Sequence, residues 1–126
     1  MNAEQFERQI SSYGAVVYFS HPAAKDFKSF SQGKKNQVLM LILKQAKKGA
    51  NFKPEGNGNR LRSPLHQFAK IKSKAIALRV VYRPVQRNGL TEIQILAIGP
   101  RNKDEVYQLA QKRITDFLEE MDAKHD

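Results

Sequence analysis

Residues 59–86 contain no Asp or Glu, and this stretch limits the possible folds more than any other part of the sequence. Within it, most regularly over residues 68–83, Lys and Arg alternate with apolar side chains. A period of two is typical of a β-strand with one dry face and one positive face. Because a long run of like charge repels itself, the pattern favours a fold that presents this positive face to a polyanion.

Composition narrows the class of protein and of partner. A length of 126 residues with 40% hydrophobic content predicts one domain over residues 1–126. The net charge of +10 favours nucleic acid as partner, then an acidic protein, with solubility alone as the last explanation. Cysteine is absent, which excludes disulfides, thiolate metal sites and a cysteine nucleophile and fits a cytoplasmic protein.

No apolar run approaches the roughly 20 residues that cross a bilayer, and the N-terminal residues lack the basic and apolar regions of a signal peptide. We therefore expect no membrane association.

The remaining patterns predict the order strand, helix, helix, strand, strand, strand, helix. This is an α+β fold, with a small antiparallel-rich sheet of about four strands and helices packed on one face. Asn88-Gly89 predicts a tight hairpin between the last two strands, because both residues tolerate positive φ. The expected elements are a strand over 15–20, a helix from Pro22 that Gly33 breaks, a helix over 34–48, strands over 65–71, 75–85 and 91–98, and a helix from 103.

Three segments fall outside this order. Residues 1–14 predict an N-terminal extension, either one or two weakly docked helical turns or a mobile arm. Residues 51–59 predict a long, mobile, turn-rich loop. Residues 116–126 predict an acidic, mobile C-terminal tail that could screen the positive face.

The period of two places several cations on one patch. If residues 78–82 form a strand, Leu78, Val80 and Tyr82 share one face, and Arg79 projects from the other together with Val81 and Arg83. Lys70 and Lys72 project together from the preceding strand. Two more polar residues follow the last strand: Arg101 emerges after Ile98-Gly99-Pro100, and Tyr107 lies about one turn into the next helix.

The combined spacing of these motifs resembles the RelE/ParE superfamily of small toxins from bacterial type II toxin–antitoxin pairs. The resemblance covers about residues 17–114 and is carried by Lys70-Ile71-Lys72, Leu78-Arg79-Val80-Val81-Tyr82, Ile98-Gly99-Pro100-Arg101, Glu105-Val106-Tyr107 and Ala110-Gln111-Lys112-Arg113. It implies a RelE-like fold, a cognate antitoxin as partner, and cleavage of messenger RNA on the ribosome. The catalytic residues that it implies are Lys70, Lys72, Arg79, Arg101 and Tyr107, and the remaining cations Arg60, Arg62, Lys74 and Arg83 are expected to bind RNA.

The implied chemistry is physically reasonable because RNA carries its own nucleophile, the 2′-OH. The protein must supply a base, positive charge for the phosphorane, and a proton for the leaving oxygen. The resemblance assigns substrate binding or base work to Lys70 and Lys72, and orientation or deprotonation of the 2′-OH to Tyr107. Arg79 stabilises the phosphate, and Arg101 the leaving side. Carboxylates offer no pair at metal-ligand spacing, so we expect no metal and no cofactor.

Two other functions remain open at this stage: a ParE-like inhibitor of DNA gyrase without nuclease activity, and an RNA-binding relative without catalysis. Each residue also has an ordinary explanation. Lysines on a solvated strand keep a protein soluble and protect an edge strand, and Tyr107 on a helix can be a packing residue. The three histidines fall in turns or near the terminus, and we leave them outside the site.

Overall fold

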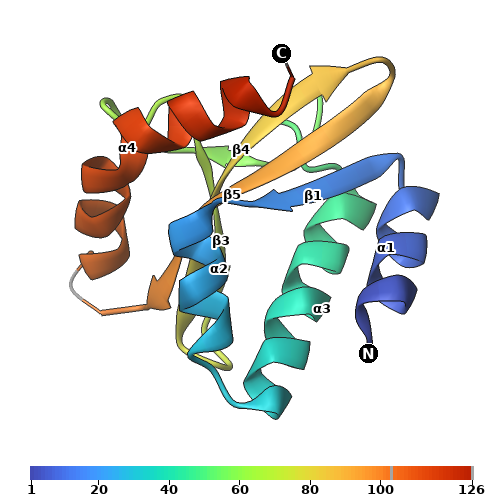
Figure 1. The fold of residues 1–126 in the computed structure, drawn as a ribbon, viewed down its shortest axis with the longest axis horizontal. Helices are drawn as coiled ribbons and strands as arrows, with labels where there is room; N and C mark the ends of the chain where they lie inside the picture. The colour runs from blue at the N-terminus through green and yellow to red at the C-terminus, as the bar shows by residue number, and fades with distance from the viewer. Residues whose placement is uncertain (103, 126) are drawn as a thin grey trace.

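The computed structural model of the protein describes residues 1–102 and 104–125 (Figure 1). These residues form four helices around a five-stranded mixed sheet with the strand order β1-β5-β4-β3-β2. The elements are α1 (Ala3–Ser12), β1 (Ala15–Phe19), α2 (His21–Lys28), α3 (Gln32–Lys48), β2 (Asn59–Arg60), β3 (Ala69–Ser73), β4 (Leu78–Arg87), β5 (Leu90–Pro100) and α4 (Glu105–Ala123). The predicted α+β class is confirmed, with one strand more than the estimate because residues 59–60 pair with the start of β3.

A long hairpin of β4 and β5 forms the centre of the sheet. Its two-residue turn is Asn88-Gly89, and both residues have positive φ (51° and 79°), as the sequence predicted. On one side β3 pairs antiparallel with β4, and on the other β1 pairs parallel with β5. The parallel pair is possible because α2 and α3 carry the chain away from β1 before the remaining strands form.

Helices cover both faces of the sheet, whereas the sequence predicted helices on one face. Figure 1 shows α4 on one side of the sheet and α1 and α3 on the other. Ile93 and Ile95 face the core formed with α1 and α3, while Val81, Leu96 and Ala97 face α4. The inner strands are therefore apolar on both faces, and a one-sided arrangement would have left the second apolar face in water.

Several element boundaries differ from the prediction. Gly33 does not break a helix but lies in the first turn of α3, which begins after Ser31, whose side chain accepts a hydrogen bond from the Lys34 backbone. The predicted strand over 65–71 begins later, because Leu65 and Phe68 are buried core residues in a turn that precedes β3. Gly49 ends α3 as predicted, with φ of 103°.

The three segments expected to be loose are ordered where the structure describes them; residue 126 of the acidic segment lies outside the described residues. The N-terminal residues form α1. A capping box starts this helix: the side chains of Asn2 and Gln5 each accept a hydrogen bond from the other's backbone N–H. The loop that follows α3 is compact, with internal backbone hydrogen bonds. The acidic segment is not a tail: α4 continues through it to Ala123, and Phe117 and Met121 are buried.

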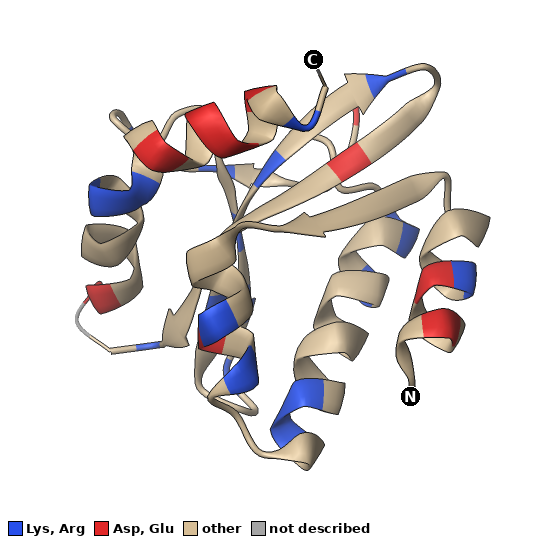
Figure 2. Ribbon diagram, viewed as in Figure 1, with Lys and Arg blue, Asp and Glu red and all other residues tan. Residues whose placement is uncertain are grey.

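Charge is distributed unevenly over these elements (Figure 2). Most Asp and Glu residues lie on α1 and α4, whereas α3 carries lysines and no acid. Strands β2, β3 and β4 contain no Asp or Glu. Among the residues described, no helix combines the length and apolar character needed to span a membrane.

Candidate functional site

The sheet register brings the predicted catalytic cations of β3 and β4 together. Lys72 lies opposite Arg79, and Lys70 lies opposite Val81. Val81 packs in the core beneath α4, so the cations that share its face project on the α4 side of the sheet. Arg79 in turn lies opposite Gly99 on β5, where a side chain larger than hydrogen would press on Val106 of α4. Lys70, Lys72 and Arg79 thus form a basic row across β3 and β4, at the edge of the core that α4 covers.

The charge of Lys70 depends on its surroundings. Lys70 is partly buried and Lys72 is exposed. Burial lowers the pKa of Lys70 below its usual 10.5, and the nearby positive charges of Lys72 and then Arg79 lower it further. A lowered pKa increases the fraction of neutral amine, which is the form that accepts a proton.

Arg79 connects the row to the start of α4. Its Nη1 donates a hydrogen bond of 3.1 Å to Oδ1 of Asp104, and its guanidinium carbon lies 5.1 Å from the centre of the Tyr107 ring. The side chain of Arg79 is only 13% exposed, whereas that of Asp104 is 72% exposed. The sequence placed Asp104 inside the first helical turn; it instead precedes α4 with φ of 61° and makes no side-chain cap. Its carboxylate therefore remains available to Arg79.

Tyr107 packs partly buried against the core under α4. Among the described residues its hydroxyl, which is buried, has no hydrogen-bond partner, and the same holds for Nε of Arg79. Burial raises the pKa of Tyr107 above its usual value, opposed in part by the Arg79 charge. Buried polar atoms without partners are uncommon in proteins, and here two of them belong to side chains that contact each other.

Arg101 lies at the rim of this row rather than inside it. Its side chain is exposed, and its backbone N–H donates a 2.8 Å hydrogen bond to the carbonyl of Ala77 in the β3–β4 turn. Ala77 has φ of 51°, an uncommon conformation for alanine. This contact fixes the exit of β5 close to the end of β4 that carries Arg79.

An open groove of about 650 Å³ adjoins the row along the outer edge of β3. Lys70 and Lys72 line it together with residues from α3, the following loop and β2. Of the predicted RNA-binding residues only Arg60 lines the groove, with its guanidinium carbon 3.7 Å from the centre of the Phe52 ring. Lys44, Lys48 and Lys53 also line the groove and were not predicted, because no local pattern shows that the end of α3 and the loop after it lie beside β3.

The other predicted RNA-binding residues are not gathered with these. Arg62 is exposed in the connection after β2, and Lys74 is exposed in the β3–β4 turn. Arg83 lies four residues along β4 from Arg79, roughly 13 Å away, and donates a 2.8 Å hydrogen bond to Gln94. Its guanidinium carbon is 5.5 Å from the centre of the Phe117 ring, so it is engaged beneath the end of α4.

The histidines make contacts away from the basic row. His125 bonds Glu92 through Nε2, and within the described residues His21 and His66 form hydrogen bonds through backbone atoms alone. His125 is thus held in place rather than mobile. Within residues 1–102 and 104–125, no cluster of three or more His, Asp or Glu side chains is arranged to hold a metal ion.

Solved structures share this fold. A mutant of the E. coli toxin RelE in the free state aligns with a TM-score of 0.57 at 23% identity, covering 78% of this chain and 95% of the toxin. The isolated E. coli RelE toxin aligns with a TM-score of 0.51 at 22% identity, over 78% of this chain and 96% of the toxin. A chain of the intact E. coli RelBE toxin–antitoxin complex aligns with a TM-score of 0.51 at 17% identity, covering 67% and 93%.

No protein-family model and no curated protein matches the sequence. The chain therefore has the RelE fold, as its motif spacing predicted, at an identity to these structures that leaves its activity to be argued from its own residues.

Proposed function

We propose that this chain, which has the fold of the RelE toxins, is the toxin of a type II toxin–antitoxin pair. In this proposal it acts in the cytoplasm as an endoribonuclease that cleaves messenger RNA on the ribosome without a metal. One observation carries the proposal: Lys72 lies opposite Arg79 in the strand register, with Lys70 beside them and Tyr107 next to the Arg79 guanidinium. These are the residues that the motif resemblance singled out.

The proposed reaction uses the nucleophile that RNA already contains. The 2′-oxygen loses its proton to a base on the protein and forms a bond to phosphorus. The bond from phosphorus to the 5′-oxygen breaks, and that oxygen takes up a proton. The products are a 2′,3′-cyclic phosphate and a 5′-hydroxyl end. Two negative charges develop on the phosphorane, and positioned cations stabilise them more in the transition state than in the substrate.

The surroundings of each residue favour particular roles. The lysine pair is the better source of a base, because its charges and partial burial lower the pKa of Lys70, whereas burial raises the pKa of Tyr107. Tyr107 then orients the 2′-OH through its hydroxyl, which has no hydrogen-bond partner within the described residues. Arg79 holds the phosphate, exchanging its single exposed carboxylate partner for the stronger charge of the substrate. Arg101 at the rim serves the leaving oxygen.

The proposed partner besides RNA is a cognate antitoxin with an acidic segment. Strands β2, β3 and β4 carry cations and no Asp or Glu of their own, which gives such a segment a basic face to cover. One of the matched structures is a toxin–antitoxin complex, which supports the same idea. Purification from the native host should then recover a small acidic protein with the toxin. Recovery of none would count against this part of the proposal.

Primer extension on messenger RNA from translating extracts tests the nuclease. The intact protein should produce new ends on ribosome-engaged message, and an Arg79→Ala, Arg101→Ala variant should not. An Arg8→Ala, Lys47→Ala variant is the matched control, because it removes two exposed cations on α1 and α3 that lie outside the row and the groove. Absence of cleavage by the intact protein would reject the nuclease. Gyrase-dependent DNA breaks in the same extracts would support a ParE-like toxin instead.

A further inference from the structure

The groove beside the basic row is a second cationic surface. Its lining includes Lys44 and Lys48 from α3, Lys53 from the loop, Arg60 from β2, and Lys70 and Lys72 from β3. Lys44 and Lys48 are four residues apart on one helix, so they project from the same face of α3. None of the described residues that line the groove carries a carboxylate. Lys70 and Lys72 belong both to the basic row and to the groove, so the groove is continuous with the proposed active site.

The loop that forms one wall of the groove is held in a fixed shape. Backbone hydrogen bonds of 2.7 Å and 2.8 Å join Asn57 to Gly49 and Gly58 to Asn51. A Cβ on Gly58 would lie 2.8 Å from the Asn51 carbonyl oxygen, which explains why glycine stands there. The position of Lys53 is therefore set by the fold rather than by the ligand, and a preorganised site loses less entropy on binding.

A buried tyrosine fastens this loop to the sheet. The Tyr82 hydroxyl donates a 2.8 Å hydrogen bond to the carbonyl of Ala50 and accepts one of 2.9 Å from the Gln45 side chain. Burial raises the pKa of Tyr82 to about 12, so the hydroxyl keeps its proton and its donor role at physiological pH. The helix, loop and strand walls of the groove thus meet at one hydrogen-bonded point.

The lining suits a nucleic-acid backbone better than a protein segment. The amides of Asn57 and Asn59 offer donors and acceptors, and the only large apolar lining side chains among the described residues are Leu41 and Ile71. Protein interfaces draw much of their affinity from apolar and aromatic anchors, and this groove offers little surface to bury them. Phosphates need only the spaced cations, and Arg60 is held for such contact by Phe52 and by a hydrogen bond to the His66 carbonyl.

We propose that the groove between α3, the loop of residues 49–58 and β3 binds the single-stranded RNA that flanks the cleaved phosphate, through phosphate contacts from Lys44, Lys48 and Lys53. The inference rests on the proposed function for the identity of the strand, and it adds a substrate-binding surface outside the catalytic row. The strand passes Lys70 and Lys72, crosses the edge of β3 and continues along α3. Binding there holds the message in register without contributing a reacting group.

Fluorescence anisotropy with labelled single-stranded RNA of about 12 nucleotides tests the groove. A Lys44→Gln, Lys48→Gln variant should bind roughly tenfold more weakly at low salt. The slope of log affinity against log salt should fall by about 0.7 for each lost phosphate contact. An Arg8→Gln, Lys47→Gln variant removes the same charge outside the groove and should keep both the affinity and the slope of the intact protein. A Lys53→Gln variant should show a smaller loss of the same kind.

The outcomes separate the groove from the nuclease proposal. Loss of RNA affinity in the groove variant, even if the intact protein cleaves nothing, supports the groove. Cleavage by the intact protein together with unchanged affinity and salt slope in the groove variant overturns the groove alone. Equal losses in the groove variant and in the charge-matched control would also overturn it. If the groove variant binds RNA normally but loses affinity for polyglutamate, the groove binds an acidic protein and the proposal fails.

Discussion

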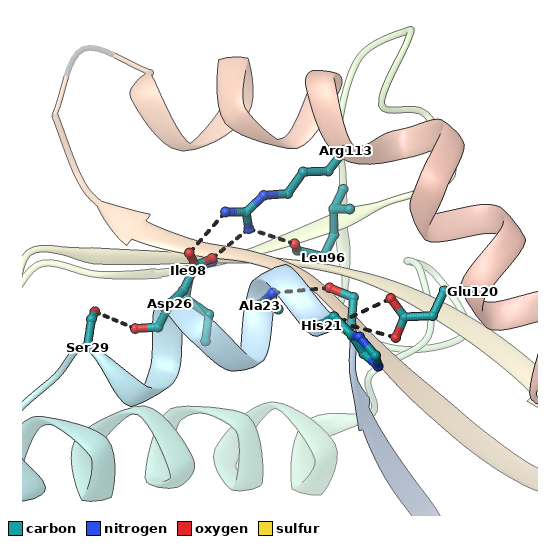
Figure 3. Close-up of polar contacts among 9 residues, drawn as sticks. His21, Ala23, Asp26, Ser29, Leu96, Ile98, Arg113 and Glu120 are labelled. Atoms are coloured by element: carbon teal, nitrogen blue, oxygen red, sulfur yellow. Dashed lines mark hydrogen bonds and ion pairs between the residues drawn. The ribbon is translucent and has the colours of Figure 1, made fainter.

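Two arginine–aspartate pairs, one at the start of α4 and one in its middle, differ in exposure and in geometry. At the contact between α2 and α4, both side chains of the Arg113–Asp26 pair are about 15% exposed, and their oxygens and nitrogens meet at 2.6 Å and 3.0 Å (Figure 3). At the start of α4, Arg79 makes one contact of 3.1 Å with Asp104, which is 72% exposed. The first pair is bidentate and enclosed, and the second is single and open to solvent.

The surroundings of each pair explain the difference. Asp26 also accepts a 3.0 Å hydrogen bond from the Ile98 backbone, and Arg113 donates one of 3.1 Å to the Leu96 carbonyl. These contacts satisfy the edge of β5 beyond the point where β1 ends, so the Arg113 pair closes the sheet. Around Arg79, in contrast, Nε of Arg79 itself and the Tyr107 hydroxyl lack partners among the described residues. One arginine is used by the fold, and the other keeps unused hydrogen-bonding capacity beside a basic groove.

Removing the enclosed pair should have the largest effect. Arg113→Ala leaves the Asp26 carboxylate buried without its counter-charge, and we expect unfolding free energy to fall by about 3–5 kcal/mol in urea titrations. Asp26→Asn added to this variant should recover part of the loss, because the uncompensated charge is then gone. A loss below about 1 kcal/mol in Arg113→Ala would show that the pair is as weak as an exposed one.

Removing the open pair should affect activity rather than stability. Arg79→Ala should lower the cleavage rate on ribosome-engaged message by about 10²–10³, the effect of losing one positioned charge in a transition state. Its unfolding free energy should change by about 1 kcal/mol or less, since the partner carboxylate is already in water. If the stability loss matched that of Arg113→Ala and folded protein cleaved normally, the distinction between the two arginines would be wrong.

Tyr107→Phe isolates the tyrosine hydroxyl, which has no hydrogen-bond partner among the described residues. The ring and its packing under α4 are kept, and a buried polar atom without a partner is removed, so stability should stay the same or rise by about 1 kcal/mol. Cleavage should fall by about 10² if the hydroxyl orients the 2′-OH. Both the unfolding free energy and the cleavage rate should be measured on the same preparation of protein. A drop in both would mean that the hydroxyl has a structural partner in the folded protein.

The sequence predicted the arrangement of the basic row more accurately than its surroundings, for a physical reason. Alternation along a strand fixes which side chains share a face, so Lys70, Lys72 and Arg79 could be placed together from residue order alone. The hairpin at Asn88-Gly89 was equally local, because its turn depends only on two residues that tolerate positive φ. Such local rules also predicted the main helices. The RelE resemblance came instead from the combined spacing of several motifs.

The missed parts depend on contacts between distant segments. No local pattern shows that Tyr82 bonds Ala50 and so orders the loop after α3. The continuation of α4 through the acidic segment, in contrast, was readable from the helical spacing of Phe117 and Met121, which are buried. The sequence did not predict that helices cover both faces of the sheet, because Val81 and Leu96 form a core beneath α4 only once β4 and β5 are paired. The capping box of Asn2 and Gln5 was a readable signal that the sequence analysis overlooked.

The pH dependence of cleavage tests whether Lys72 lowers the pKa of Lys70 and so makes it the base. If the Lys70 amine accepts the proton, the rate rises with pH through the pKa of Lys70 and levels off above it. Lys72→Gln removes a charge that lowers this pKa, so the pKa should rise toward its usual value and the rising limb should move to higher pH. Lys47→Gln is the charge-matched control, and its profile should superimpose on that of the intact protein. An unmoved limb in Lys72→Gln would exclude Lys70 as the base.

The smallest effect that we expect lies on the enclosed side, at the first turn of α2. The Glu120 carboxylate accepts hydrogen bonds of 3.1 Å and 3.2 Å from the His21 backbone N–H, as Figure 3 shows. It therefore adds negative charge at the positive end of the helix dipole. Glu120→Gln keeps an acceptor oxygen but removes the charge, and urea titrations should give a loss of about 0.3–1 kcal/mol that shrinks at high salt. The cleavage rate should be unchanged, because Glu120 contacts the start of α2 and not the basic row. A change in RNA affinity without a change in stability would instead mean that the acidic half of α4 acts on the basic row, as a screening tail would have done.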